Sequence, residues 1–167
     1  MVVNARPMIN SADIERNGYV WAMADTLDLP EVGEPAIVNT DIKGGQGVHW
    51  LCIARTRGDK CFIYDPLGAS NVRGASTGEK TDTALWRSLI ESGIDPNGVE
   101  IYRHKSQKSG NSLCGWHSLY VASIIKKNLA RHPNASPQDL GALVAHKLDK
   151  RASEHNIEVL HRAFGRP

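Results

Sequence analysis

Two short runs rich in β-forming residues, joined by a tight turn, constrain this chain more than any other feature. The first is VHWLCIAR, residues 48–55, and the second is CFIYD, residues 61–65. Valine, isoleucine and aromatic residues favour strands, and the connection Thr56-Arg57-Gly58 fits a three-residue hairpin loop with a left-handed glycine. The sequence therefore predicts an antiparallel hairpin with Gly58 in its turn.

The predicted hairpin brings a histidine and an acid onto one face. If Arg55 closes the turn opposite Asp59, His49 lies directly across from Asp65. A carboxylate beside a histidine fixes its tautomer and stabilises the imidazolium, which a base serving a thiol requires. A cross-strand polar pair on a solvated face fits equally well, and a one-residue register shift would send the two side chains to opposite faces. The hairpin alone leaves both interpretations open.

A cysteine stands where a polar loop turns into an apolar helical segment, in SGNSLCGWHSL, residues 109–119. The helical pattern runs from Leu113 to about His132, and with Ser112 as N-cap the Cys114 thiol lies in the first turn. Free N–H groups and the helix dipole favour a thiolate there. Cysteine is also among the most buried residue types, so a structural role fits this position as well.

Other segments predict a mixture of strands and helices. Ser11 is the predicted N-cap of a short helix that Asn17-Gly18 interrupts, and the stretch from Gly18 to Pro35 is predicted to be weakly structured. The further predictions are strands at AIVNT (36–40) and VEIYR (99–103), a flexible loop at KGGQG (43–47), and helices at TALWRSLIESG (83–93) and SPQDLGALVAHKL (136–148). The fold class that follows is α+β, a mixed central β-sheet flanked by helices.

Composition limits the possible classes. The chain has 167 residues, 41% hydrophobic and 23% charged, which predicts a single domain over residues 1–167. No apolar run is long enough to span a bilayer, and residues 1–10 lack the pattern of a signal peptide, so neither a membrane protein nor a secreted one is expected. Three cysteines without paired spacing make a disulfide framework unexpected.

Four motifs occur in a definite order: AIVNT (36–40), GVHW (47–50), YDPLG (64–68) and QKSGNSLCG (107–115). Together they resemble the adenovirus maturation protease (adenain) family and, more widely, the cysteine peptidases of the adenain and SUMO-deconjugating type. The family order is His-Trp, an acid, a Gln and then Cys-Gly. The matching positions are His49, Asp65, Gln107 and Cys114. The resemblance covers roughly half of the chain and implies the adenain/SUMO-protease-like (permuted papain-like) cysteine protease fold.

The resemblance also implies a role for each matching residue. Cys114 would attack the scissile carbonyl as a thiolate, and His49 would hold the thiol proton and pass it to the leaving amine. Asp65 would orient His49. Gln107 would donate its side-chain amide to the oxyanion, together with the backbone N–H of Cys114. Without the resemblance, Gln107 would be interpreted as a loop glutamine that faces water.

Two departures from adenain matter. The acid is Asp65 where adenain has Glu, which changes the reach of the side chain and not its role, and here the chain resembles the SUMO-deconjugating relatives. Adenain carries a further cysteine that binds an activating peptide through a disulfide, and the matching region DPNGVEIY (95–102) has none. A disulfide-linked activator is therefore not expected. Cys52 and Cys61 are predicted core residues, and Trp50 is a predicted packing wall beside His49.

The predicted function is limited proteolysis of viral capsid or structural precursors during virion maturation, with cleavage next to glycine. A monomer in the virion interior or the infected cell, in its cytoplasm or nucleus, is expected, without a cofactor. The alternatives are a deconjugase for ubiquitin-like modifiers of the SUMO type and an acetyltransferase effector with the same triad. His117 follows Cys114 at a zinc-ligand spacing, but no second ligand pair accompanies it, so no metal site is expected.

A basic segment gives one further prediction. Residues 101–138 contain no acid, and non-specific DNA binding is predicted through their six basic residues, although ordinary solvated charges explain them slightly better because the net charge is only +2. These residues are Arg103, Lys105, Lys108, Lys126, Lys127 and Arg131. A DNA-binding module without enzymatic activity would leave the ordered triad unexplained.

Overall fold

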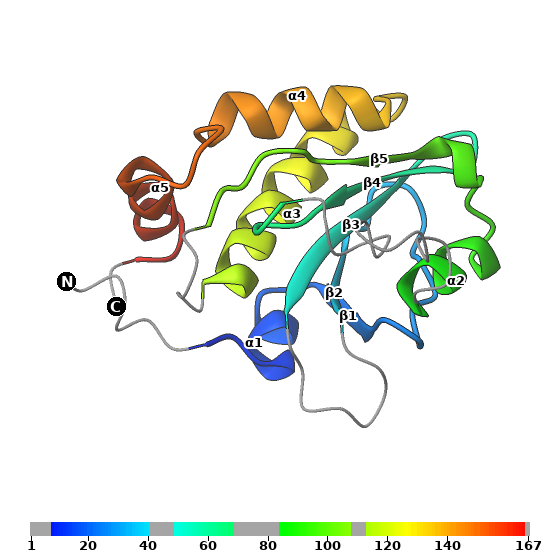
Figure 1. Cartoon of the computed structure of the whole chain (residues 1–167), viewed down its shortest axis with the longest axis horizontal. Coiled ribbons are helices and arrows are strands. Elements are labelled where there is room, and N and C mark those ends of the chain that lie inside the picture. Colours follow the sequence, from blue (N-terminus) through cyan, green and yellow to red (C-terminus); the bar gives the residue numbers. More distant parts are fainter. Residues whose placement is uncertain (1–7, 41–48, 69–83, 108–112, 166–167) are drawn as a thin grey trace.

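A mixed sheet with helices on both faces forms the protein (Figure 1), so the predicted α+β class is confirmed. The computed structural model describes residues 8–40, 49–68, 84–107 and 113–165. The strands are β1 (Val20–Met23), β2 (Ala36–Asn39), β3 (Trp50–Thr56), β4 (Lys60–Tyr64) and β5 (Val99–Ile101). The helices are α1 (Ser11–Arg16), α2 (Ala84–Glu91), the short 3₁₀ helix η3 (Pro96–Gly98), α3 (Cys114–Arg131), α4 (Pro137–Lys147) and α5 (Glu154–Phe164).

The sheet has the strand order β1-β2-β3-β4-β5. The three central strands pair in antiparallel fashion, whereas β1 is parallel to β2 and β5 is parallel to β4. A parallel pair needs a crossover connection, and the chain from β4 to β5 passes through α2. The sheet is therefore mixed, as predicted.

The hairpin of β3 and β4 forms with a different register from the predicted one. Arg55 pairs with Cys61 instead of Asp59, which is a shift of two residues. Gly58 has φ 79° and Asp59 has φ 57°, so both take left-handed backbone conformations and Asp59 belongs to the turn rather than to the ladder. The predicted left-handed Gly58 is confirmed, and the predicted Arg55 closure is wrong because β3 continues for one more residue.

Two other local predictions near the N-terminus are wrong. Residues 20–23 form β1, because so short a strand is decided by its pairing with β2 and not by local propensity. The N-cap of α1 is Asn10 instead of Ser11: its side chain accepts from the Asp13 N–H while the Asp13 carboxylate accepts from the Asn10 N–H. The predicted loop at 43–47 lies outside the described residues.

The two faces of the sheet carry separate apolar clusters, because successive side chains of a strand point to opposite faces. One face packs against α3, and the other packs against α2. Cys52 belongs to the first cluster and Cys61 to the second, and both are free, fully buried thiols, as predicted for core residues. On α2, Leu85, Trp86 and Leu89 are buried in the second cluster, whereas Ile90 is 44% exposed.

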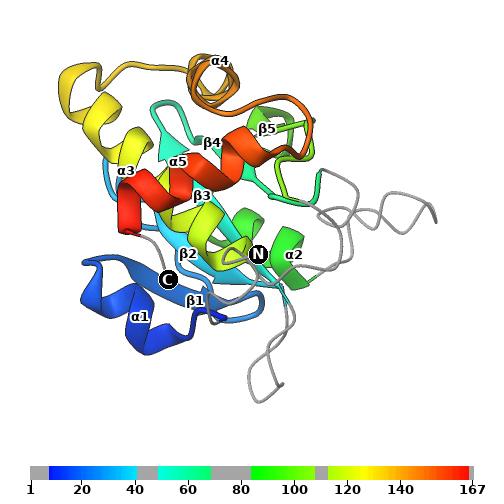
Figure 2. The same cartoon turned by 90° about the vertical axis from the view of Figure 1, so that its left-hand side faces the viewer.

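The C-terminal helices cover the sheet and the start of α3. The helix predicted at 136–148 is confirmed as α4, where Ser136 forms a capping box with Asp139 and proline occupies the first helical position. Helix α5 crosses α3 (Figure 2), and Leu113 packs with Ile157 and Leu160 there. The first turn of α3 is thereby enclosed. Among the described residues, no helix has both the length and the apolar character needed to cross a membrane.

Candidate active site

His49 and Asp65 lie at the open end of the central hairpin. His49 directly precedes β3 and Asp65 directly follows β4. The register differs from the predicted one by two residues, which preserves the side of the sheet that each residue faces. His49 Nε2 lies 2.6 Å from Asp65 Oδ1, with the two side chains 8% and 0% exposed. The structure therefore brings together the imidazole and the carboxylate in a buried hydrogen bond.

Cys114 is the first residue of α3 and is 8% exposed. The predicted cap, Ser112, lies outside the described residues, and the N-cap position is Leu113, which makes no side-chain capping bond. The N-terminal end of α3 thus directs its backbone N–H groups and the positive end of its dipole towards the thiol. The Ser118 hydroxyl donates to the Trp50 carbonyl at 3.1 Å and fixes α3 against the start of β3.

The thiol and the imidazole interact directly. Burial raises the pKa of Cys114, but hydrogen bonds with His49 and with the backbone N–H groups of Trp50 and Gly115 outweigh it and lower that pKa. Burial lowers the pKa of His49, but the hydrogen bonds with Asp65 and Cys114 outweigh it and raise that pKa to about 9. Nε2 is bonded to Asp65, so Nδ1 is the ring nitrogen left for the thiol. Both shifts favour a thiolate beside an imidazolium near neutral pH.

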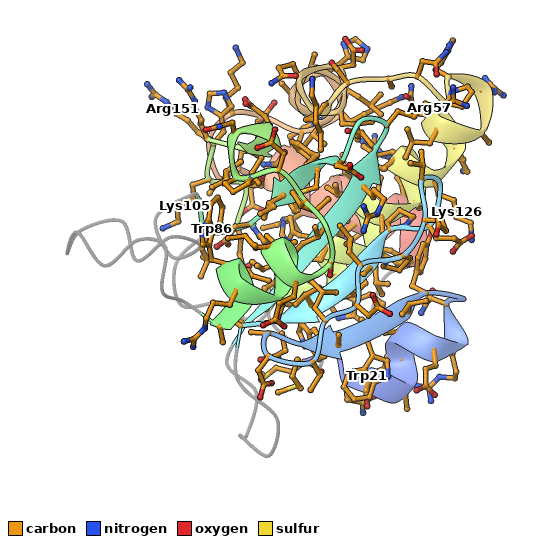
Figure 3. The ribbon with its side chains drawn as sticks, turned by 90° about the vertical axis from the view of Figure 1, so that its right-hand side faces the viewer. Trp21, Arg57, Trp86, Lys105, Lys126 and Arg151 are labelled. Atoms are coloured by element: carbon orange, nitrogen blue, oxygen red, sulfur yellow. The ribbon has the colours of Figure 1, made fainter. Side chains whose placement is uncertain are left out.

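The glycine after the cysteine has a steric reason. A Cβ on Gly115 would lie 1.6 Å from Ile9 Cγ2, 2.8 Å from Ile9 Cβ and 3.3 Å from Trp50 Cδ1. The Trp50 indole donates to the Ile9 carbonyl at 3.3 Å, and its ring packs edge-on against Trp21 with centroids 6.4 Å apart. Trp21 lies on β1 (Figure 3). Trp50 therefore packs against Ile9 and Trp21 at the first turn of α3, and Gly115 leaves room for Ile9 there.

Gln107 is buried, with 2% exposure. Without the family resemblance it would have been expected to face water. The backbone N–H groups of Ser106 and Gln107 both donate to the Pro66 carbonyl, at 2.9 and 3.0 Å. Pro66 directly follows Asp65 in the chain. The segment that carries Gln107 is thereby tied to the segment that carries the acid.

His117 belongs to the buried core. It is fully buried, and its Nδ1–H donates to the Leu113 carbonyl at 2.9 Å. Burial lowers its pKa to about 4, against the opposing effect of that hydrogen bond, so the ring is neutral at physiological pH. Within the described ranges, no group of three or more His, Cys, Asp or Glu side chains is placed to hold a metal ion.

Two residues near the site escaped the sequence analysis. Ser118 follows Cys114 by four positions, which places the two on the same face of a helix, and this spacing could have identified it. No sequence spacing of this kind identifies Ile9, because Ile9 and Gly115, which are in contact, lie more than a hundred residues apart in the chain. Side-chain contacts of that range come from tertiary packing alone.

Comparison with known proteins gives one family match. The sequence model of the family described as adenovirus endoprotease matches residues 26–126, which is more than half of the chain. Among curated proteins there is no match. The matched range contains His49, Asp65, Gln107 and Cys114. The chain therefore belongs to the adenovirus endoprotease family and is a viral, adenain-like cysteine protease.

Proposed function

We propose that Cys114, His49 and Asp65 form the catalytic triad of this protease. One observation carries the proposal: the buried His49 ring is hydrogen-bonded to a carboxylate through Nε2 and also to the thiol at the start of α3. A nucleophile, a base within hydrogen-bond reach and a third group that orients the base are the requirements of nucleophilic acyl transfer. Gln107 and the Cys114 backbone N–H are the proposed oxyanion donors.

The proposed reaction starts from the thiolate–imidazolium pair. The Cys114 sulfur attacks the scissile carbonyl carbon, and the C=O electron pair moves to oxygen, where the Gln107 amide and the Cys114 N–H stabilise the negative charge. Collapse of this intermediate breaks the C–N bond, and the His49 imidazolium gives its proton to the leaving amine. The resulting thioester is hydrolysed by a water molecule that His49 deprotonates, and the thiolate is regenerated.

The proposed substrates are viral capsid or structural precursors, cut next to glycine during virion maturation in the virion interior or the infected cell. Family membership supports the viral role. The proposal also includes a single protease domain over residues 1–167 that acts as a monomer. It further includes the permuted papain-like arrangement, which the order His49, Asp65, Gln107, Cys114 supports.

Co-expression with candidate capsid precursors tests this function. Intact-mass analysis should find products cut next to glycine with the wild-type chain and uncut precursors with Cys114→Ala. Uncut precursors, together with release of a fluorophore from SUMO or ubiquitin C-terminal substrates, would replace the proposal with a deconjugase. Acetyl-cysteine at Cys114 after incubation with acetyl-CoA, without cleavage of any of these substrates, would instead indicate an acetyltransferase.

DNA binding stays a prediction, and the positions of the basic residues in the structure indicate where on the protein a duplex would bind. Lys105 follows β5 and Lys126 lies on α3, at opposite sides of the view in Figure 3. Lys126 pairs with Glu34 at 3.4 Å and covers the Tyr19 ring, whereas Lys108 lies outside the described residues. The basic residues therefore form two groups, and we place a duplex contact at the C-terminal end of α3.

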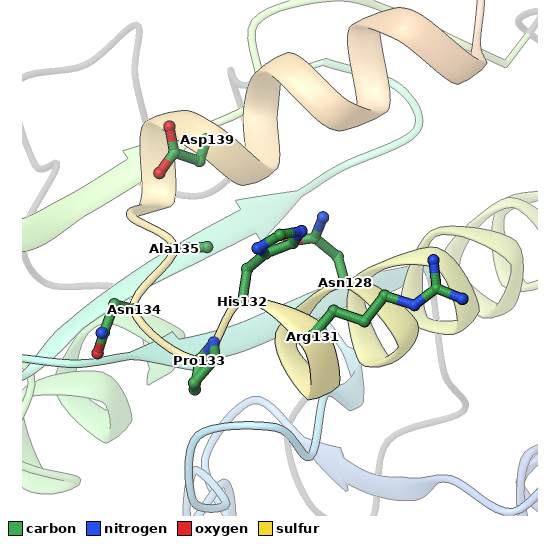
Figure 4. Close-up of a pocket in the computed structure, with 7 residues that line it drawn as sticks. All are labelled: Asn128, Arg131, His132, Pro133, Asn134, Ala135 and Asp139. Atoms are coloured by element: carbon green, nitrogen blue, oxygen red, sulfur yellow. The ribbon is translucent and has the colours of Figure 1, made fainter.

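Basic side chains from two helices meet at that end of α3. Lys127 and Arg131 are exposed there, and Lys147 of α4 lines the same pocket of about 310 Å³. A neighbouring pocket of about 520 Å³ is also lined by Arg131 and His132 (Figure 4). Lys127→Glu with Arg131→Glu should abolish the low-salt anisotropy change of a labelled duplex. Arg103→Glu with Lys105→Glu is the matched control, and equal loss in both double variants would contradict the placement.

A further inference from the structure

One peptide group next to the proposed oxyanion donor is held at both of its polar atoms. The N–H of Gln107 donates to the Pro66 carbonyl at 3.0 Å. The oxygen of the same peptide, the Ser106 carbonyl, accepts from the Asn156 side chain at 3.1 Å. A peptide plane held by hydrogen bonds at its N–H and its carbonyl cannot rotate without breaking one of them. The orientation of the backbone at Gln107 is therefore fixed.

Asn156 is fully buried and uses both ends of its side chain. Its Oδ1 accepts from the Asp149 N–H at 2.7 Å. Its Nδ2 donates to the Ser106 carbonyl and, at 3.3 Å each, to the carbonyls of Asp149 and Arg151. The residue thus joins three segments: the first turn of α5, the loop before α5 and the strand-to-loop segment that carries Gln107. Burying a side-chain amide costs little free energy when all its polar groups are hydrogen-bonded, and such an amide makes the three joined segments more rigid.

We propose that Asn156 is a positioning residue of this protease, which holds the Ser106–Gln107 peptide so that the Gln107 amide faces the oxyanion. The proposal rests on the proposed oxyanion role of Gln107. Asn156 does not touch the reacting atoms: it acts through the Ser106 carbonyl. It also lies outside the range that the family model matches, on the helix that packs over the start of α3.

Two features of the geometry favour positioning over simple packing. The Asn156 side chain makes four hydrogen bonds, all to backbone groups, and one of them reaches a carbonyl fifty residues earlier, directly before Gln107. The same Pro66 carbonyl that receives the Gln107 N–H follows the acid Asp65. Asn156 therefore completes a path of hydrogen bonds that fixes the oxyanion donor relative to the triad acid. A displacement of about 1 Å at such a donor can cost roughly 10²-fold in rate.

The test is a double-mutant cycle with Gln107. Asn156→Ala should lower kcat roughly 10- to 100-fold with little change in KM. The reason is that the Gln107 amide binds the oxyanion, which exists only in the transition state and not in the bound substrate. In a Gln107→Ala background, the same change should lower kcat by less than about twofold, since the donor it positions is already absent. The rate of Cys114 alkylation should stay unchanged, because the Cys114–His49 pair is not touched.

Ser153→Ala is the matched control for stability. It removes the N-cap of α5, whose hydroxyl accepts from the Asn156 N–H at 3.4 Å, and leaves the Ser106 contact in place. It should lower the melting temperature and preserve kcat. If Asn156→Ala does not fold, Asn156→Asp is the second variant. It keeps the oxygen that accepts from the Asp149 N–H but puts a carboxylate oxygen, which cannot donate, in place of Nδ2. It should show the same kinetics as Asn156→Ala.

The outcomes separate the two proposals. A fully active Gln107→Ala variant would overturn the oxyanion role of Gln107, and the positioning role with it. An impaired Gln107→Ala variant, combined with an Asn156 effect of equal size in both backgrounds, would overturn the positioning role alone. A fall in kcat and in Cys114 alkylation together would show that Asn156 only supports the fold, and would also overturn it.

Discussion

Gly115→Ala is a small change with a large expected cost. The added Cβ would lie 1.6 Å from Ile9 Cγ2, whereas ordinary contacts begin at 3.4 Å, so Ile9 or α3 must move by about 2 Å. Overpacking of this kind costs about 1–3 kcal/mol, offset in part by the helix propensity of alanine, about 0.5–1 kcal/mol. We expect a net loss of about 1–2 kcal/mol and a melting temperature lower by roughly 2–8 °C.

Thermal unfolding followed by circular dichroism measures this loss, and Gly141→Ala is its matched control. A Cβ on Gly141, in α4, would meet Phe62 Cε1 at 3.5 Å, an ordinary contact. That variant should be unchanged or more stable by up to about 1 kcal/mol. Ile9→Ala removes Cγ2, so Gly115→Ala should cost less in that background. A melting temperature for Gly115→Ala equal to that of the wild type, or strict additivity with Ile9→Ala, would refute the steric argument.

Three further outcomes follow from the site. The pH profile of kcat/KM should be bell-shaped: the thiolate is lost as the pH falls through the lowered pKa of Cys114, and the imidazolium is lost as it rises through about 9, the pKa of His49. Asp65→Asn should move the alkaline limb to lower pH, because the carboxylate raises the His49 pKa, and an unmoved limb would contradict this cause. Gln107→Ala should lower kcat roughly 10²–10³-fold in a peptide-cleavage assay, and full activity would remove it from the mechanism.

The hairpin and the triad order were predictable because they depend on local signals. Strand-forming runs around Gly58 fixed the hairpin, and its two-residue register error left His49 and Asp65 on the same face. Serine at the N-cap and proline after it likewise predicted the start of α4. Where a pattern repeats along a short stretch of chain, the sequence is enough to place an element.

Contacts between distant segments were not predictable. β1 forms only because β2 pairs with it, and the packing of Ile9 on Gly115 appears once the sheet and α3 are assembled. Asn156 interrupts the apolar face of α5 beside Ile157, which is a signal of a buried polar role, but the sequence does not say which carbonyl it would meet. These long-range contacts set the precision of the site.

The central claim is that Cys114 is an activated thiolate held by His49. Alkylation with iodoacetamide at mildly acidic pH, with each modified cysteine assigned by mass spectrometry, tests it directly. We expect labelling of Cys114 alone, because its pKa is lowered whereas Cys52 and Cys61 are fully buried, and we expect His49→Ala to abolish this labelling at mildly acidic pH. Equal labelling of the three cysteines, or labelling of Cys114 that is unchanged in His49→Ala, would contradict the account.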